Sequence, residues 1–378
     1  MQSGSLAIWY HWSPAKKGQA TRAAAEVHVN LWRRRIKRRS NKEETFIDIG
    51  FRFRDASSIA AFQLYVPFRV DQSHILDLGR ILHDRGTLMA VFNEAYIAGG
   101  IDNVGTYSIH DTSDKEILCC HSLRPGIDFT AASRDYGGHG STIIHFTETL
   151  CARFKGDVDQ YIRFRILLNK DIDNTFSKLA RQFDWILLSA IPRDEVIEFR
   201  FDERRSLPQE IIDEMSAREH HEQFKLVAVH YFLIREIDSH FVMSDADFHK
   251  VRLLENSLWS KYLQGTVGGD LRHDSFIYHW RRIGDPNLDL GDYHALAKFR
   301  RMITGWWTIS FYVLIILLIG IAGNLAATWM WASWFSSKTS QAAPPKPDST
   351  CSGPGRALYN HQLSTQNIGN EGTIDARS

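Results

Sequence analysis

Apolar and polar residues alternate strictly along several short segments of this chain. In residues 45–55, Ile47, Ile49 and Phe51 fall on one side of an extended chain, whereas Asp48 and Arg52 fall on the other. A period of two is typical of a β-strand with one buried face. Residues 62–70, 160–168 and 196–203 repeat the pattern, and residues 225–236 and 274–282 are further candidate strands. The chain before residue 304 is therefore expected to be rich in β-strands.

The loops between these segments predict how some of the strands pair. Residues 45–55 and 62–70 are separated by a short loop, so we expect them to form an antiparallel hairpin. Pro67 has no N–H to donate, which predicts an edge strand or a bulge at that point. The glycine-rich residues 134–141 lack the Lys-Ser/Thr ending of a P-loop and precede a strand-like segment, which favours a hairpin or a long loop.

Helical spacing of apolar residues is less frequent. It occurs in residues 173–185, 206–223 and 250–264. Residues 290–303 carry an acidic residue near their start and basic residues near their end, as a helix dipole favours, and are also expected to be helical. Strands with a few helices and no regular βαβ order predict an α+β or β-sandwich-like fold, with mostly antiparallel strands.

The most apolar segment runs from Thr304 to Phe335, inside a window without any charged side chain. About 20 apolar residues suffice to cross the hydrocarbon core of a bilayer. Tryptophan prefers the membrane interface, and the segment has tryptophans at both ends. These are Trp306 and Trp307 at one end, and Trp329, Trp331 and Trp334 at the other. The pattern predicts one transmembrane helix over residues 304–335.

Flanking charges and composition predict how the chain is organised around this helix. The first residues show no signal peptide, and Lys298, Arg300 and Arg301 precede the apolar segment, so we expect a cytoplasmic N-terminus and an external C-terminus. The domains are then a cytosolic β-rich part (1–303, with a boundary near 169–208), the helix (304–335) and a Ser/Pro/Gly-rich disordered tail (336–378). Arginine outnumbers lysine, which suggests a GC-rich bacterial genome and hence a bacterial inner membrane.

Charge balance makes nucleic acid an unlikely partner. Lys and Arg total 45 and Asp and Glu total 44, and four basic and three acidic residues follow Thr304, which leaves 41 of each before it. A neutral domain is not built as a general polyanion binder. The densest basic run comprises Arg33, Arg34, Arg35, Lys37, Arg38 and Arg39. It is expected to contact lipid phosphates, with a solvated strand end as the alternative.

Neither the cysteines nor the adjacent histidines have the spacing of a metal site. Cys119 and Cys120 are adjacent in a strand-like segment and so point to opposite faces, which makes them poor partners for one metal. Cys151 is expected to be a reduced thiol, and Cys351 lies alone in the tail. The chain has seventeen histidines, and two of them are adjacent in the Glu-His-His-Glu sequence of residues 219–222. This sequence lacks the spacing of a zinc-binding helix.

The remaining metal candidates are Asp245, Asp247 and His249. Asp247-Phe-His249 resembles the Asp-x-His motif that opens calcineurin-like phosphoesterases, but their later Gly-Asn-His-Asp/Glu and Gly-His-x-His blocks are missing from this chain. The alternative is a loop with a capping aspartate. No G-x-S-x-G motif occurs, and the sequence leaves any catalytic residue or cofactor unidentified.

One face of the apolar helix carries small residues and an amide. Gly320, Gly323, Asn324 and Ala327 lie three and four residues apart and therefore share a face. Small residues let two helices approach closely, and an asparagine in lipid seeks a hydrogen-bond partner. The pattern favours self-association through this face, and a plain anchor is the alternative.

Together, these patterns predict a membrane-anchored binding or sensing module rather than an enzyme. Its cytosolic domain is expected to recognise a partner protein or a small ligand, using exposed strand arginines such as Arg163 and Arg165. Two alternatives remain at this point. One is a membrane-tethered, metal-dependent hydrolase around Asp247 and His249, and the other is an oligomerising effector that perturbs the membrane.

Overall fold

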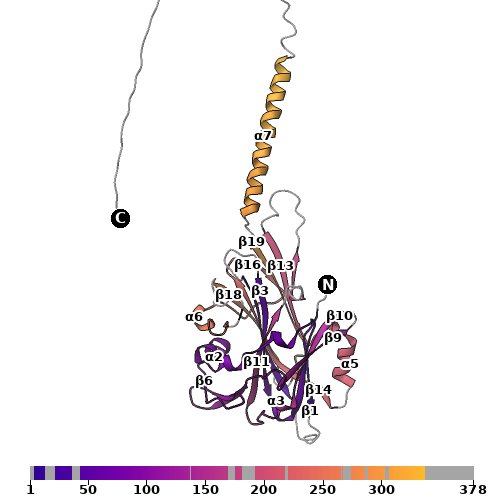
Figure 1. Cartoon of the computed structure of the whole chain (residues 1–378), viewed down its shortest axis with the longest axis vertical. Coiled ribbons are helices and arrows are strands. Elements are labelled where there is room, and N and C mark those ends of the chain that lie inside the picture. The colour runs from indigo at the N-terminus through magenta and orange to yellow at the C-terminus, as the bar shows by residue number, and fades with distance from the viewer. Residues whose placement is uncertain are drawn as a thin grey trace, which may run out of the picture. The chain divides into compact units, whose positions relative to one another are not determined.

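The computed structural model describes residues 4–12, 22–35, 43–136, 138–168, 175–180, 192–217, 220–264, 266, 274–285, 288–302 and 306–336. It forms two compact units, Met1–Tyr312 and Val313–Ser378. The first unit consists mostly of antiparallel strands with few helices, and the described part of the second belongs to the apolar helix α7 (Trp306–Ser336) (Figure 1). The fold class expected from the alternating pattern is therefore confirmed.

The strands of the first unit form three sheets. The five-stranded sheet has the order β14–β1–β4–β10–β9, with β1 (Ala7–Trp12), β4 (Ile59–Val66), β9 (Phe129–Tyr136), β10 (His139–Phe146) and β14 (His221–Gln223). The four-stranded sheet has the order β12–β13–β19–β16, with β12 (Ser177–Ala180), β13 (Pro192–Phe201), β16 (Ser239–Ser244) and β19 (Tyr293–Met302).

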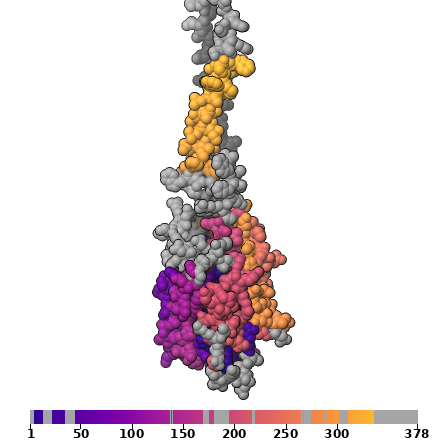
Figure 2. All heavy atoms as spheres, turned by 90° about the vertical axis from the view of Figure 1, so that its right-hand side faces the viewer, coloured from indigo at the N-terminus to yellow at the C-terminus, as the bar shows by residue number. Residues whose placement is uncertain are grey.

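The ten-stranded sheet has the order β17–β18–β15–β2–β3–β11–β8–β7–β6, and β5 also pairs with β11. Its strands are β2 (Ala24–Arg35), β3 (Glu43–Arg54), β5 (Ile75–Asp77), β6 (Ile97–Ala98), β7 (Thr106–His110), β8 (Glu116–His121), β11 (Asp159–Leu168), β15 (Lys225–Glu236), β17 (Lys250–Leu253) and β18 (Ser275–Ile283). Two of its pairs are parallel, β2 with β15 and β8 with β11. Because β2 and β15 are far apart in sequence, their pairing joins distant segments, and Figure 2 shows early, middle and late segments side by side on the surface of this unit.

Short helices complete the first unit. They are α1 (Gly79–Leu82), α2 (Arg85–Phe92), α3 (Glu148–Cys151), α5 (Gln209–Ala217) and α6 (Asn256–Trp259), together with the 3-10 turns η2 (Ala56–Ser58), η3 (Gln72–His74) and η4 (Arg204–Ser206). Helices α2 and α6 lie on one side of the ten-stranded sheet, and α5 lies against the five-stranded sheet (Figure 1).

The main core lies between the sheets. Alternate residues of β2, β3 and β11 point to the same side of the ten-stranded sheet, and Val27, Phe51 and Phe164 among them are completely buried. They pack in one cluster with Phe62 of β4 and Phe199 of β13. The residues at the other parity face α1, α2 and α6, where a second apolar cluster forms. Strict alternation thus gives the ten-stranded sheet two covered faces, and the second of them also carries polar side chains.

The expected hairpin between residues 45–55 and 62–70 is wrong. Strand β3 pairs with β2 and β11, whereas β4 pairs with β1 and β10 in the other sheet. The short link carries the chain between two facing layers, where both strands bury their apolar side chains in one core, and the rings of Phe51 and Phe62 lie 6.3 Å apart. Pro67 follows the end of β4, so it removes no ladder hydrogen bond from a strand that has neighbours on both sides.

Several expected helices are also wrong. Residues 293–302 form strand β19, because Tyr293, Ala295, Ala297 and Phe299 alternate into the core, and this period of two outweighs the helix-like placement of end charges. Residues 177–180 form β12, and residues 250–264 begin as β17 before the one-turn helix α6. Helix α5 confirms part of the helix expected over residues 206–223, whose last residues form strand β14 instead. The pairing of β9 with β10 confirms a hairpin at residues 134–141.

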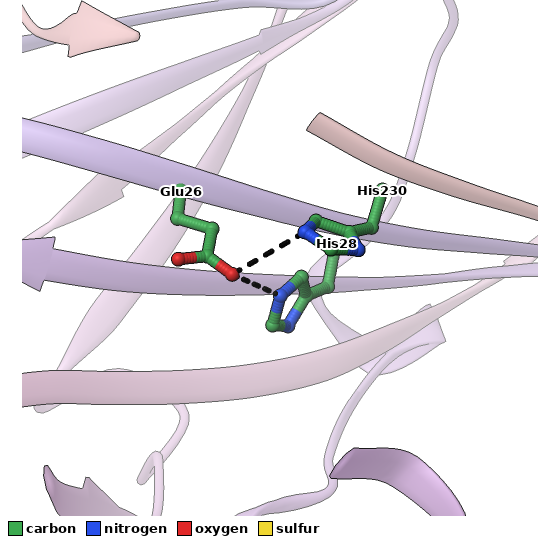
Figure 3. Close-up of side chains that lie close together, drawn as sticks. All are labelled: Glu26, His28 and His230. Carbon is green, nitrogen blue, oxygen red and sulfur yellow. Dashed lines mark hydrogen bonds and ion pairs between the residues drawn. The ribbon is translucent and has the colours of Figure 1, made fainter. Parts of the chain in front are cut away.

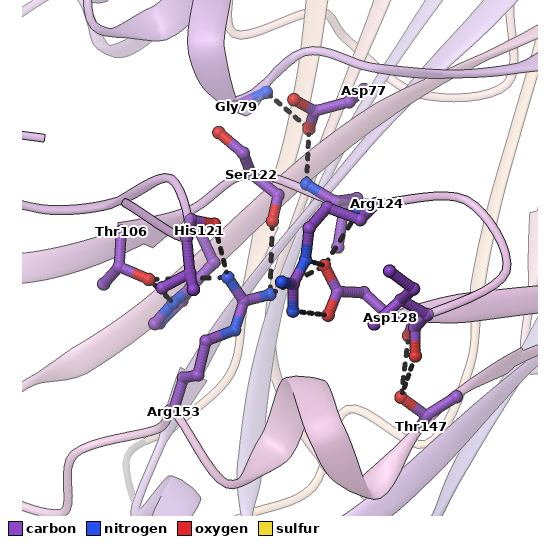
Figure 4. Close-up of polar contacts among 12 residues, drawn as sticks. Asp77, Gly79, Thr106, His121, Ser122, Arg124, Asp128, Thr147 and Arg153 are labelled. Carbon is purple, nitrogen blue, oxygen red and sulfur yellow. Dashed lines mark hydrogen bonds and ion pairs between the residues drawn. The ribbon is translucent and has the colours of Figure 1, made fainter. Parts of the chain in front are cut away.

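A buried polar network fixes the loops beside β8 (Figure 4). The carboxylate of Asp128 is completely buried, accepts two hydrogen bonds from Arg124 at 2.8–2.9 Å, and lies 3.0 Å from Arg153. Arg153 also donates to the carbonyl oxygens of Val104 and Ser122. Because these charged groups are engaged with one another and with the backbone, the network has a structural role.

Candidate histidine cavity

The candidate site lies on the face of the ten-stranded sheet that is turned away from the main core. Val27 and Val29 of β2 point into that core, so Glu26 and His28 point to the opposite side. Strand β15 runs parallel to β2 with His230 opposite His28, and this register adds a third polar side chain to the same face. Strand β18 contributes His279 next to β15, in register with Phe232.

Glu26, His28 and His230 lie close together (Figure 3). Oε1 of Glu26 is 3.0 Å from Nε2 of His28 and 3.5 Å from Nε2 of His230. The other ring nitrogens are also engaged, because Nδ1 of His28 lies 3.3 Å from the hydroxyl of Tyr161, and Nδ1 of His230 lies 3.2 Å from Nε2 of His279. Both rings are therefore held at both nitrogens, which fixes their orientation toward the carboxylate.

Burial and neighbouring charges set the protonation of this cluster. Burial disfavours the charged form of Glu26, but the hydrogen bond from His28 and the positive charges around it outweigh this effect and lower the pKa of Glu26 to about 2. Burial, together with neighbouring histidines and Arg281, lowers the pKa of His230 and that of His279 to about 3. At neutral pH, Glu26 is therefore a carboxylate, and His230 and His279 are neutral imidazoles that can accept a hydrogen bond or a metal ion.

The cluster borders a cavity of about 330 Å³. Ala90 and Phe92 of α2 and Trp259 of α6 line it opposite the sheet. Its charged lining is mainly cationic, with five basic side chains (Arg52, Arg163, Lys250, Arg252 and Arg281) against the two carboxylates of Glu26 and Glu94. Lys250 and Arg281 are exposed, which places them at the solvent side. The volume suits a small molecule, and the charge suits an anion.

Two of the residues that line this cavity each have a buried donor that lacks an acceptor among the described residues. The donors are Nη2 of Arg163 and Nε1 of Trp259. The rest of the Arg163 guanidinium is held firmly, because Nε donates to the hydroxyl of Tyr262 at 2.7 Å and Nη1 donates to that of Tyr161 at 3.1 Å. A buried donor without an acceptor costs about 1–3 kcal/mol, and more when it is charged. An oxyanion in the cavity would supply the missing acceptors.

Gly50 of β3 makes room for this arrangement. It lies between His28 on β2 and Arg163 on β11 in the sheet register, and the side chain of Tyr161 passes over it. A Cβ atom at this position would lie within 3.0 Å of Nη1 of Arg163 and closer still to the hydroxyl of Tyr161. The glycine therefore permits the close approach that links Tyr161 to both Arg163 and His28.

Replacing Gly50 with alanine is expected to destabilise the first unit by about 1–3 kcal/mol, because the methyl group displaces Tyr161 and Arg163 from a packed site. Denaturant-induced unfolding of the full chain in detergent measures this change. Gly100→Ala is the matched control, since nothing lies within 4 Å of the added Cβ, and it should change stability by less than about 0.5 kcal/mol. Equal effects of the two substitutions would contradict the close contact at Gly50.

A second hollow, of about 440 Å³, lies over Arg69, Asp71, His74, Ser133, Arg134 and Asp135. Its central ion pair joins Arg69 to Asp135 at 2.7 Å, and both side chains are more than half exposed. Exposed pairs of this kind contribute little free energy. The hollow therefore lacks the buried, unsatisfied donors that distinguish the histidine cavity.

No protein-family model and no curated protein sequence matches this chain.

Two of the candidate metal ligands suggested by the sequence, Asp245 and His249, have different surroundings in the structure. Asp245 accepts a hydrogen bond from the backbone of Leu296 and pairs with Nδ1 of His294 at 3.1 Å, whereas His249 lines the histidine cavity with its ring against His279. Asp245, Asp247 and His249 do not form a metal-sized group, and among the described residues the group that does is Glu26, His28 and His230.

The arginines singled out from the sequence are buried rather than exposed. Arg163 and Arg165 are each only 1 % exposed, because α6 and the residues after it cover that face of β11. Arg33 and Arg34 are also buried and pair with Glu195 and Glu44, so their guanidinium groups face inward. Lys37, Arg38, Arg39 and the side chain of Arg35 lie outside the described residues, and lipid contact there stays a prediction.

Helix α7 contains the stretch Ser310–Phe335, which is long and apolar enough to cross a membrane. Trp329, Trp331 and Trp334 are exposed on it, and an added Cβ at Gly320 or Gly323 would meet nothing within 4 Å. The side chains of Trp306 and Trp307 lie outside the description. Self-association through Gly320, Gly323, Asn324 and Ala327 stays a prediction. Cys119, Cys120 and Cys151 are buried thiols, and Cys351 is not described.

Proposed function

We propose that this protein is a single-pass membrane protein whose β-rich unit binds a small organic oxyanion in the histidine cavity. The anion is a molecule that carries a phosphate or carboxylate group, which the basic lining would hold. Membrane attachment through α7 would keep this binding unit at the membrane surface, in the manner of a sensor or receptor module.

The observation that carries the proposal is Arg163. Its guanidinium is almost completely buried and is oriented by the hydroxyls of two tyrosines. One of its N–H groups has no acceptor among the described residues, and the side chain belongs to the cavity lining. A buried arginine is an expensive group to hold unless its charge and its donors are used. Planar guanidinium groups match the oxygen atoms of phosphates and carboxylates, which favours an anionic ligand over a neutral one.

For the membrane part of the proposal, sequence features supply the support. Lys298, Arg300 and Arg301 precede α7, and this excess of positive charge favours a cytoplasmic β-rich unit. The excess of arginine over lysine favours a bacterial inner membrane. The small residues around Asn324 favour association of two or more copies, which would bring two cavities onto one assembly.

Inorganic phosphate tests anion binding directly. We expect isothermal titration of the full-length protein in detergent, in the presence of a chelator, to show one phosphate per chain. Arg163→Met should weaken binding by at least about tenfold, because a charge-assisted hydrogen bond contributes about 1.5–3 kcal/mol.

Two further variants distinguish a loss of anion binding in the cavity from a loss caused by misfolding. Arg281→Met removes an exposed charge at the solvent side of the cavity and should weaken phosphate binding severalfold without affecting the fold. Arg134→Met removes an exposed charge at the other hollow and serves as the matched control. Absence of phosphate binding, or binding that is lost only in Arg134→Met, would overturn the proposal.

A further inference from the structure

We propose that Glu26, His28 and His230 together bind one divalent transition-metal ion at the wall of the histidine cavity. This inference depends on the proposed anion binding in one respect only. The open position of the metal ion would face the bound anion, which is its expected further ligand. Metal binding itself needs no anion, because these three side chains are its protein ligands.

The ligand atoms are already close to the spacing that a metal ion requires. They all lie within 4.8 Å of one another, and the carboxylate oxygen of Glu26 is 3.0 Å and 3.5 Å from the two Nε2 atoms. A zinc ion binds nitrogen and oxygen at about 2.0–2.1 Å, which places neighbouring ligand atoms about 3.4 Å apart in a tetrahedral site. Small rotations of the side chains therefore suffice to form the site.

The positions of these residues follow from the backbone. Glu26 and His28 are two residues apart on one strand and so share a face, and the parallel register of β2 with β15 places His230 directly beside His28. A site built across two central strands of a sheet is rigid, which favours preorganised ligands.

Outer partners hold both histidines in the way that metal ligands are usually held. A metal-binding histidine typically uses its second ring nitrogen in a hydrogen bond. Nδ1 of His28 faces the hydroxyl of Tyr161, and Nδ1 of His230 faces His279. When Nε2 of His28 binds the metal, the ring proton resides on Nδ1 and is donated to Tyr161, so the change of tautomer needs no movement of the ring.

Tyr161 also connects the three proposed metal ligands to Arg163, the residue proposed to bind the anion. Its hydroxyl accepts a hydrogen bond from Nη1 of Arg163 and lies next to His28. Three protein ligands leave at least one position open, as in zinc sites that bind a water molecule or a substrate. An oxygen atom of the bound anion is the expected ligand for that position.

The ligand types restrict the metal. Two imidazoles and one carboxylate suit Zn²⁺, Fe²⁺, Co²⁺ or Ni²⁺, whereas Mg²⁺ and Ca²⁺ prefer sites made entirely of oxygen atoms. Without metal, the same three side chains form a closed polar cluster, in which Glu26 also lies 3.5 Å from Arg54. This closed polar cluster is the alternative that an experiment must exclude.

Metal binding is tested with the full-length protein in detergent, treated with a chelator and then titrated with Co²⁺ and Zn²⁺ in the absence of phosphate. We expect one metal ion per chain, with visible absorption bands of a low-symmetry Co²⁺ site. Glu26→Gln and His230→Gln should each weaken binding by at least about 100-fold. His279→Gln, which removes an outer partner, should weaken it by about 10–100-fold.

Controls separate the specific site from surface binding and from misfolding. His74→Gln removes a histidine of the other hollow and should leave the affinity for Co²⁺ unchanged. Circular dichroism melting shows whether each variant is folded. Binding of less than one equivalent, or binding that is equal in the wild type and in the folded Glu26→Gln and His230→Gln variants, would overturn the proposal.

The two proposals can fail independently. Phosphate binding that persists with chelator, combined with absence of Co²⁺ binding, would retain the anion site and remove the metal site. Stoichiometric Co²⁺ binding without any phosphate binding would do the reverse.

Discussion

Replacing Asp48 with alanine is expected to destabilise the β-rich unit by about 3–5 kcal/mol, because it leaves a buried cation without its partner. Asp48 is completely buried and accepts two hydrogen bonds from Arg165, at 2.6 Å and 3.1 Å. Trp32 and Tyr262 each donate a further hydrogen bond to the same carboxylate, at 2.8 Å. The substitution would therefore leave three groups without an acceptor in a low-dielectric interior.

Denaturant-induced unfolding of the full chain in detergent measures this loss. Asp71→Ala is the matched control, since the side chain of Asp71 is 82 % exposed, and it should change stability by less than about 0.5 kcal/mol. Because Tyr262 also orients Arg163, the Asp48 variant should lose phosphate affinity even where it is still folded. A free-energy change below about 1 kcal/mol would show that the buried ion pair is not formed as described.

Removal of residues 304–378 is expected to release the protein from membranes completely. The stretch Ser310–Phe335 is the described segment that is long and apolar enough to cross a bilayer, and insertion of such a helix into lipid is effectively irreversible. The wild-type chain should stay in the membrane pellet after extraction with alkaline carbonate, whereas the shortened chain should appear in the supernatant.

A second deletion separates the helix from the tail. Removal of residues 337–378 alone should leave the protein in the membrane pellet, because α7 is retained. Release of this variant, or retention of the chain that lacks residues 304–378, would contradict the role given to the helix.

The strands could be predicted from the sequence because their pattern is local. Alternation in residues 45–55, 160–168 and 196–203 depends on which side of one strand is buried, and the structure has strands in each of these places. The further candidate at residues 225–236 is also a strand. The partners of β3 could not be predicted, because the chain crosses from one sheet to another through a link as short as a hairpin loop. The sequence predicts a helix in place of strand β19, because the charges at the ends of this segment fit a helix and its alternation includes small alanines.

Burial of the polar face explains the errors about the arginines. Alternation shows that Arg163 and Arg165 lie opposite the core, but it does not reveal that α6 covers that face. The charged partner of Arg165 is Asp48, which lies on a strand more than 100 residues away in sequence. Nothing in the local pattern distinguishes such a covered face from a solvated one.

The histidine cavity could not be found from sequence spacing for a related reason. Glu26 and His28 form a short Glu-x-His motif on one strand, but His230 joins them only through the parallel pairing of β2 with β15. The high number of histidines is a signal in the sequence, but it does not show which histidines lie together. Residues of the same parity on neighbouring strands meet only through the sheet order, which the sequence does not reveal.

The central claim is that the histidine cavity is the anion-binding site, and tungstate tests it most directly. Tungstate is a heavy oxyanion with a strong anomalous signal, so diffraction from crystals of the full-length protein grown with it locates the bound anion. We expect tungsten in the cavity beside Arg163 and Trp259, with the tungstate oxygen atoms accepting hydrogen bonds from both. An empty cavity with tungsten bound at Arg69 and Arg134 instead would contradict anion binding in the histidine cavity.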